Sequence, residues 1–265
     1  MAAVTTMDAL IQALQGQQRF GWSKGSFTPQ ATGAFHSMWL VAGEPGPGVA
    51  PGSLTPGVIP TDATAGAFPF TNATGDNYLG YVSATGLAVG TLVIFDRIWH
   101  NSTTNAATGA QAVTFPGLTR YTTGLGVECW LEWYTVSGAA TASNCTVTYT
   151  DESGNAGATG TVVMPAVTKS AGQMFPMQFA SGDSGIRALS AMNLTVTQTT
   201  GTWGLTLMKR LAEIPIRPSD QAASVLNAVD LGLPEIADDA CLSMMFQGAV
   251  TANTLCGSFG IAKSL

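Results

Sequence analysis

Short runs of strand-forming residues recur along most of the chain, and turn-forming residues separate them. Threonine, valine, tyrosine, phenylalanine and tryptophan enrich the runs, while clusters such as NATGDN, DESGNAG and SGDSG divide them. Many short strands at regular spacing are typical of a β-sandwich or barrel. The pattern therefore predicts a mainly β chain, with strands at residues 78–83, 91–99, 112–115, 126–136, 145–150, 159–164, 174–179, 191–197 and 203–211.

One short helix is expected before the strands and one after them. Residues 5–15 have apolar residues at helical spacing, between a threonine cap and Gly16. The segment PSDQAASVLNAVDLGLP repeats that spacing between Ser219, as the cap, and Gly232. We expect a jelly-roll-like β-sandwich with a short N-terminal helix and one short C-terminal helix. The apolar helix positions are Met7, Leu10, Ile11 and Leu14 in the first helix and Ala222, Val225, Leu226 and Val229 in the second. The first helix packs on its own sheet or on a neighbouring subunit, so its four apolar residues are candidate interface residues.

The clearest hairpin joins residues 145–150 to residues 159–164 across the turn DESGNAG. Successive side chains of a strand point to opposite faces, so one set lies inward and the threonines lie outward. The inward set is Cys145, Val147 and Tyr149, and the outward set is Thr146, Thr148 and Thr150.

A long segment at residues 43–57 interrupts the strands. It holds four prolines and five glycines, which excludes a helix or a continuous strand ladder. Long loops of this kind are usually binding or linking elements, so we interpret it as an exposed arm that reaches a neighbour through Pro45, Pro47 and Pro51. We divide the chain into an N-terminal helical segment (1–18), a β-sandwich domain (19–214), and a C-terminal helix and tail (215–265) that packs on the domain or on a neighbour. Residues 240–265 are expected to be either a final pair of strands or a tail.

Charge is scarce along the whole chain. Only 10% of the residues are charged, against about a quarter in ordinary soluble domains. The net charge of −6 and the absence of a basic cluster exclude a nucleic-acid partner. A surface with so little charge does little to keep a protein soluble and monomeric. It is typical of a protein whose surface is covered by copies of itself or by partners.

The sequence contains no pattern for a membrane span, a signal peptide or a metal site. The apolar runs are far shorter than the roughly 20 residues that a span needs, and the N-terminus lacks a basic region. Synthesis in a cytoplasm is therefore expected. The four cysteines form no CxxC pair and are expected to be buried free thiols, with no metal and no cofactor bound. They are Cys129, Cys145, Cys241 and Cys256.

One string resembles a catalytic loop. Residues 182–185, GDSG, resemble the nucleophile loop of trypsin-like serine proteases, which also needs a histidine base. The chain offers only His36 and His100, and neither has the context of that family's histidine. We therefore expect a turn there and no catalytic residue. His100 is expected at the end of a strand in which Asp96 and Arg97 form a structural pair, although a pH-sensing site is the alternative.

Two carboxylates share a strand face with a tryptophan. Even spacing puts Glu128, Trp130 and Glu132 on one face, and it turns the intervening residues toward the core. A sugar-cleaving or sugar-binding site is one interpretation, and a solvated or interface face is the other. The acidic group Glu235, Asp238 and Asp239 lacks the spacing of a calcium loop and is expected to be a solvated turn.

Aromatic residues dominate interface energetics, so the six tryptophans are candidates for partner contacts. Trp39, Trp99 and Trp133 have apolar neighbours and are expected in the core. Trp22 and Trp203 lie beside glycines and are the candidate interface anchors, with the core as the alternative.

The chain resembles virion structural proteins of tailed bacteriophages. The resemblance is carried by the low charge, the short N-terminal helix and the strings WLVAGEPGPG, FPFTN, DRIWHNS, YTDESGNAG, FPMQFASGDSGIRAL and WGLTLMKRLAEIPI. It covers most of the chain. It implies a capsid decoration (cement) or auxiliary head protein, located on the capsid exterior.

Such a protein would be non-enzymatic and would stabilise a capsid. Its partners would be itself, as a homo-oligomer such as a trimer, and a major capsid protein. It would bind neither nucleic acid nor a membrane. A tail or baseplate component, a jelly-roll major capsid protein, and a carbohydrate- or receptor-binding module are the alternatives.

Overall fold

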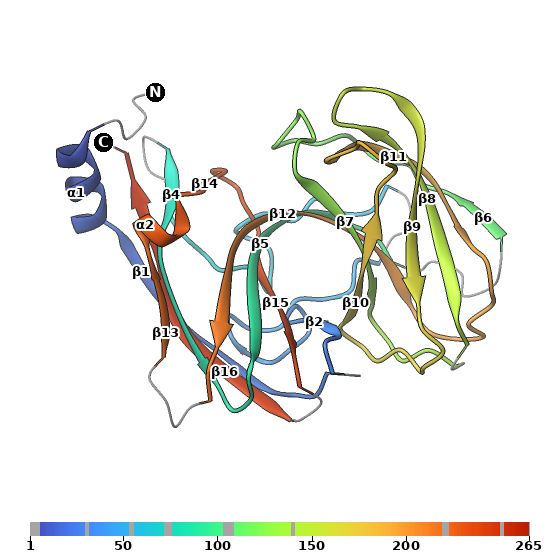
Figure 1. Cartoon of the computed structure of the whole chain (residues 1–265), viewed down its shortest axis with the longest axis horizontal. Coiled ribbons are helices and arrows are strands. Elements are labelled where there is room, and N and C mark those ends of the chain that lie inside the picture. The colour runs from blue at the N-terminus through green and yellow to red at the C-terminus, as the bar shows by residue number, and fades with distance from the viewer. Residues whose placement is uncertain are drawn as a thin grey trace.

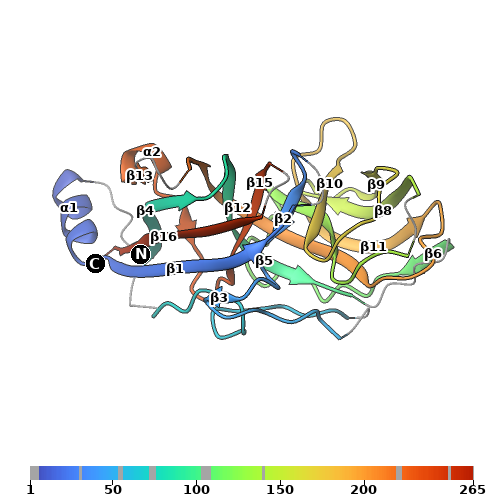
Figure 2. The same ribbon diagram turned by 90° about the horizontal axis from the view of Figure 1, so that it is seen from below.

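The computed structural model describes residues 6–29, 32–52, 56–71, 76–102, 109–138, 141–218, 223–249 and 252–264. Over these residues the chain is mainly β, as predicted, with one short helix before the first strand and a second short helix between β13 (Ser224–Asn227) and β14 (Glu235–Ile236). The strands form two antiparallel systems that lie side by side along the long axis of the molecule (Figures 1 and 2).

A six-stranded sheet forms one end of the molecule. Its order is β13, β4, β16, β1 and β3, and β14 also pairs with β4. These strands span Ser224–Asn227 (β13), Asn77–Gly86 (β4), Asn253–Lys263 (β16), Gln18–Phe27 (β1), Gly43–Glu44 (β3) and Glu235–Ile236 (β14).

The second system has ten strands, and six of them close into a barrel. β2 pairs with both β15 and β10, so the ring runs β2, β15, β5, β12, β7, β10 and back to β2. The ring strands span Phe35–Ser37 (β2), Leu242–Gly248 (β15), Gly90–His100 (β5), Trp203–Ile216 (β12), Val127–Trp133 (β7) and Gln173–Gln178 (β10). From β10 the sheet continues to the far end of the molecule through Ala156–Met164 (β9), Ser143–Asp151 (β8), Ile186–Leu194 (β11) and Gly109–Ala112 (β6).

The buried apolar residues form four clusters, and the smallest consists of Trp39, Ala67, Tyr134 and Cys241. The other three are arranged around the barrel. One part lies between the six-stranded sheet and the outside of β5, β12 and β15. A second lies between the barrel and the sheet of β8, β9 and β11. The third lies inside the barrel, and each of the six ring strands contributes to it: Phe35, Phe95, Trp130, Met174, Met208 and Met245.

The N-terminal helix is confirmed. α1 spans Met7–Gln15, Thr6 caps it by accepting a hydrogen bond from the amide of Ala9, and Gly16 ends it. The helix lies beside the end of β16, and Leu14 comes so close to Gly80 that a Cβ there would lie 3.0 Å from it. Small residues on the sheet thus make room for the helix.

The second helix is shorter than predicted and starts later. α2 spans Ala228–Leu231, because Asn227 and Asp230 form a capping box there, and Gly232 ends it in the left-handed conformation. Val225 and Leu226 lie on β13 instead, paired with β4. The predicted cap Ser219 and Ala222 lie outside the described residues.

The described part of residues 240–265 forms two strands, as one of our two expectations had it, and not a tail. β16 lies between β4 and β1 and pairs with both, while β15 belongs to the barrel. The reason is the alternation in β16, which turns Leu255, Phe259 and Ile261 into the core. The segment is therefore part of both strand systems.

The loop at residues 43–57 is docked rather than extended, so the exposed-arm interpretation is wrong for its described part. Pro45 and Pro51 are buried, whereas Pro47 and Pro56 are exposed. The loop carbonyls accept hydrogen bonds from buried side chains: Val49 O from Trp39 Nε1 at 2.8 Å, and Pro56 O from Trp99 Nε1 at 2.9 Å. Buried tryptophans need such acceptors, and this need holds the loop against the barrel.

Candidate functional site

The strongest concentration of charge lies inside the barrel. Arg97 on β5 and Glu132 on β7 are fully buried, and their side chains form a two-point ion pair, with Arg97 Nη2 donating to Glu132 Oε1 at 3.2 Å. Thr206 on β12 donates to Glu132 at 2.7 Å, and Arg97 donates to Ser37 at the end of β2 at 3.2 Å. Four ring strands thus meet at one ion pair.

Polar partners compensate for the burial of this pair. Burial alone would raise the pKa of Glu132, but the guanidinium of Arg97 and hydrogen bonds from Arg97, Ser37 and Thr206 hold that pKa below its usual value. The Trp39 ring lies 4.6 Å from Arg97 Cζ, in cation–π geometry. Glu132 is therefore ionised and fully engaged, and it is not free to exchange protons.

His100 lies beside this pair and is neutral. Its Nδ1 is 3.3 Å from Arg97 Nη1 and 3.2 Å from the hydroxyl of Tyr134. Burial, and then the charge of Arg97, lower the pKa of His100 to about 3. The pH-sensing alternative near neutrality is therefore not supported by its surroundings.

Asp96 and Arg97 do not pair with each other, contrary to our expectation. Neighbours on a strand point to opposite faces, so Asp96 leaves the barrel and meets Arg120 in a two-point ion pair at 2.6 and 2.7 Å. The amide of Cys241 also donates to Asp96 at 2.9 Å. The two pairs lie on the two sides of one strand.

Glu128 and Trp130 do share a face with Glu132, but that face is the barrel interior. Trp130 is 2% exposed and donates from Nε1 to Glu128 at 2.8 Å. Arg210 donates to both oxygens of Glu128, at 3.0 and 3.1 Å. No open surface remains on which Trp130 could stack against a sugar. The interpretation of this strand face as a sugar site is therefore wrong.

The GDSG segment is a turn before β11. The amides of Ser184 and Gly185 donate to Glu152, each at 3.1 Å, and Tyr149 donates to Asp183. Both histidines lie on barrel strands instead: His36 stacks on Phe27, and His100 contacts Arg97. The structure therefore does not bring a serine and a histidine together in this region.

The acidic group at residues 235–239 is also engaged with neighbours. Asp238 accepts from Asn77 at 2.9 Å, and Asp239 lies 3.8 Å from Arg120. Within the described residues, no three His, Cys, Asp or Glu side chains are grouped so as to hold a metal ion. The four cysteines are free, and Cys256 alone among them is exposed, contrary to the expectation that all four are buried.

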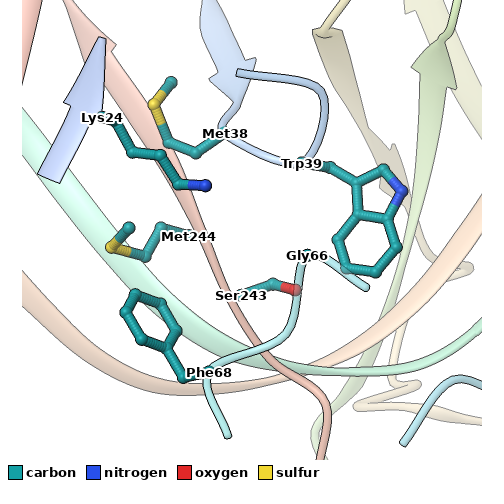
Figure 3. Close-up of a pocket in the computed structure, with 7 residues that line it drawn as sticks. All are labelled: Lys24, Met38, Trp39, Gly66, Phe68, Ser243 and Met244. Carbon is teal, nitrogen blue, oxygen red and sulfur yellow. The ribbon is translucent and has the colours of Figure 1, made fainter. Parts of the chain in front are cut away.

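Lys24 is a buried amine on β1 with two acceptors. Its Nζ donates to the backbone oxygens of Val41 at 3.2 Å and Pro45 at 2.8 Å. Figure 3 shows it among Met38, Phe68 and Met244, with Trp39 and Ser243 across a small gap that leaves no room for a water molecule. Lys24 ties the docked loop to the six-stranded sheet.

We expect Lys24 to make the folded state more stable as the pH rises. Burial, opposed in part by Glu44, lowers the pKa of Lys24 from 10.5 to about 8. Between these values the unfolded chain still holds the proton that the folded chain has released, so the free energy of unfolding rises with pH, by up to about 3 kcal/mol at about 1.4 kcal/mol per pKa unit. Urea denaturation at pH 7 and pH 10 measures it, with Lys24→Met as the control. Parallel pH dependences of the two proteins would refute this account.

The exposed face of β8, β9 and β11 carries threonines, as the hairpin predicts. Neighbouring strands align Thr146 with Thr161 and Thr148 with Thr159, and Asn193 continues the first row. We name these five residues the threonine face. It lies at one end of the molecule (Figure 1), and its rows contain no charged residue.

The outer face of the six-stranded sheet, at the opposite end, carries small residues. Ser83 aligns with Ser258 and Gly21, and Thr85 aligns with Cys256 and Ser23. We name these six residues the glycine–serine face. None of the six is charged, Ser83 is 8% exposed, and the exposed Arg19 of β1 lies beside them on the same face. Among the described residues, seven charged ones are meanwhile buried: Lys24, Asp96, Arg97, Arg120, Glu132, Asp151 and Lys169.

The predicted interface anchors fall into two groups. Trp22 and Trp203 are 3% and 0% exposed, so they belong to the core of the single chain, as do Pro45 and Pro51. Met7 and Ile11 are 69% and 45% exposed on α1, whereas Leu10 and Leu14 are half-buried. Met7, Ile11 and Pro47 alone among the predicted anchors are fully open to a partner.

Among the described residues, no helix is long and apolar enough to cross a membrane.

Comparisons with known proteins identify no family for this chain. No protein-family model and no curated protein matches the chain. Among solved structures the chain is similar to the infectious bursal disease virus VP2 subviral particle, with 10% identity and a TM-score of 0.21 over 93% of this chain and 81% of that chain. It is also similar to the Gx strain structure of that virus, with 10% identity and a TM-score of 0.22 over 94% of this chain and 81% of that chain. Likenesses at these TM-scores carry no argument about fold or function.

Proposed function

We propose that this protein is a non-enzymatic structural component of a virus particle, which associates with copies of itself and with a major capsid protein to stabilise the capsid as a decoration protein. The observation that carries the proposal is the pair of uncharged sheet faces at opposite ends of the molecule. Two such faces allow one chain to contact more than one neighbour, and many weak equivalent contacts add up in a closed shell.

The chemistry of the interior supports a structural role. The buried charged groups Arg97 and Glu132 form an ion pair that joins strands of the barrel, and Asp96 and Arg120 form a second buried pair. His100 is buried and neutral. The resemblance of the sequence to tailed-phage virion proteins supports placing the protein on a particle, with the capsid exterior as its location.

Size-exclusion chromatography with light scattering tests the proposal, on the purified protein alone and mixed with capsids that lack it. We expect self-association and saturating binding to the capsids, both nearly independent of salt because the faces are uncharged. Raised heat resistance of the coated capsids would support decoration. A protein that stays monomeric and ignores capsids would contradict the proposal, and a stable oligomer that ignores capsids would favour a tail component.

We expect Thr148→Lys to weaken association at least tenfold. The substitution puts a charge in the middle of the threonine face, and burying it at a contact between copies costs at least about 1.4 kcal/mol, which is a factor of ten. Thr122→Lys is the matched control, because Thr122 is exposed in the turn before β7. Light scattering over a dilution series measures the change. If both variants associate like the parent protein, the threonine face is not a contact.

A further inference from the structure

A groove opens where β10 changes partners. β10 pairs with β2 through Gln173 and Met174, and with β9 through Met177 and Gln178. The groove lies in the fork between these partners and has a volume of about 370 Å³. By scale from the roughly 150 Å³ cavity that holds benzene, it has room for about 15 non-hydrogen atoms.

The lining is apolar and uncharged. Phe35 forms one wall, Pro165 and Val167 form the other, and Met174, Phe175 and Pro176 of β10 line the fork between them. Phe35 packs edge-on against Trp130 at 4.7 Å between ring centroids, so the wall is fixed by the barrel interior. An ion placed here would find no counter-charge, which excludes a charged ligand.

One polar side chain in the lining has an unused donor. Gln173 is 1% exposed, and its Oε1 accepts from the amide of Ser170 at 3.3 Å. Within the described chain no hydrogen bond engages the side-chain nitrogen of Gln173. Ligand pockets typically combine an apolar lining with a few such polar groups, which orient the ligand.

We propose that this groove binds a neutral, largely apolar small molecule of about 10–15 non-hydrogen atoms, whose acceptor oxygen takes a hydrogen bond from Gln173. The size separates this occupant from a second copy of the chain, because a stable protein contact needs about 800 Å² from each partner. The ligand would bridge β2 and the segment after β9, where the barrel closes through only a few residues.

Ligand-observed NMR with three matched probes tests the proposal. Butyrophenone has an acceptor oxygen, butylbenzene has none, and 4-phenylbutyrate is charged. We expect saturable binding, with butyrophenone about fivefold tighter than butylbenzene, the factor that a net hydrogen bond of about 1 kcal/mol gives. Phenylbutyrate should bind weakest. Absence of saturable binding up to millimolar concentration, or tightest binding of phenylbutyrate, would overturn the proposal.

Two variants locate the binding. Val167→Trp should fill the groove and abolish binding, whereas Val163→Trp, on the 55% exposed Val163 of β9, should leave it unchanged. Gln173→Leu should remove the preference for butyrophenone over butylbenzene while butylbenzene still binds. Circular dichroism confirms that each variant is folded. Unchanged binding to Val167→Trp would place the site elsewhere and refute the assignment.

Discussion

Arg97→Met is expected to lower the free energy of unfolding by about 3–5 kcal/mol, the usual effect of removing one partner from a buried ion pair. The loss comes from Glu132, which would remain in the barrel without its counter-charge. Arg97 and Glu132 are both fully buried, and their hydrogen-bonding neighbours include the hydroxyls of Thr206, Ser37 and Tyr134 and the neutral ring of His100, none of which carries a charge. Urea denaturation followed by circular dichroism measures the change.

The double variant Arg97→Met, Glu132→Met should recover most of the loss. Methionines in place of the pair would extend the apolar cluster inside the barrel, where Met174, Met208 and Met245 already lie. Buried ion pairs are often replaced by apolar residues at little net change in stability. A double variant as unstable as the single one would contradict this account. It would show that the ion pair stabilises the barrel beyond offsetting the cost of burying its two charges.

Arg210→Met is the matched control. Arg210 also pairs with glutamates, Glu128 and Glu213, but its side chain is 32% exposed. Ion pairs open to water contribute about 0–1 kcal/mol, so the control should lose little stability. Equal losses in Arg97→Met and Arg210→Met would contradict the argument that burial, rather than pairing, decides the effect.

Local patterns predicted most of the strands between residues 77 and 216 but not how they join, and they placed a helix where β13 lies. The alternation in residues 145–150 correctly predicted that Cys145, Val147 and Tyr149 point into the core. In a strand with one buried face, the alternation of apolar and polar residues shows which side chains are buried. The closure of the barrel rests on β2, which has three residues and no pattern of its own. Its two pairings join segments more than 100 residues apart, and no local signal specifies them.

The barrel network was missed for the same reason. Arg97 and Glu132 lie 35 positions apart, and their pairing depends on β5 and β7 both bordering β12. The sequence showed Glu128, Trp130 and Glu132 on one face but not what that face covers. The only signal was indirect: a chain with so few charges places several of them on strands rich in apolar residues.

The loop at residues 43–57 failed for a different reason. Proline and glycine exclude a regular ladder, and the interpretation as an exposed arm assumed that an irregular segment stays in solvent. Its carbonyls instead accept hydrogen bonds from buried donors outside the loop, which lie 10 to 43 positions from their acceptors: Lys24, Trp39 and Trp99. The backbone carbonyls of an irregular loop can accept hydrogen bonds from buried donors as well as from water. An irregular loop can therefore be docked on the protein rather than exposed.

Trp203→Ala is expected to destabilise the single chain by about 3–5 kcal/mol, the usual loss when a buried tryptophan leaves a cavity. Trp203 is 0% exposed at the start of β12 and pairs with Trp133 of β7, 6.3 Å away between ring centroids. The core position, rather than a partner contact, explains why a tryptophan lies beside Gly201 and Gly204. Urea denaturation at two protein concentrations measures the loss.

Concentration separates the two roles of Trp203. A core residue changes stability by the same amount at every protein concentration, whereas an interface anchor changes it more as the protein becomes concentrated and associates. Leu125→Ala is the control, since Leu125 is 58% exposed and surface substitutions change stability by about 0.5 kcal/mol or less. A concentration-dependent loss in Trp203→Ala would return Trp203 to the interface. The contact between copies would then include the start of β12 as well as the threonine face and the glycine–serine face.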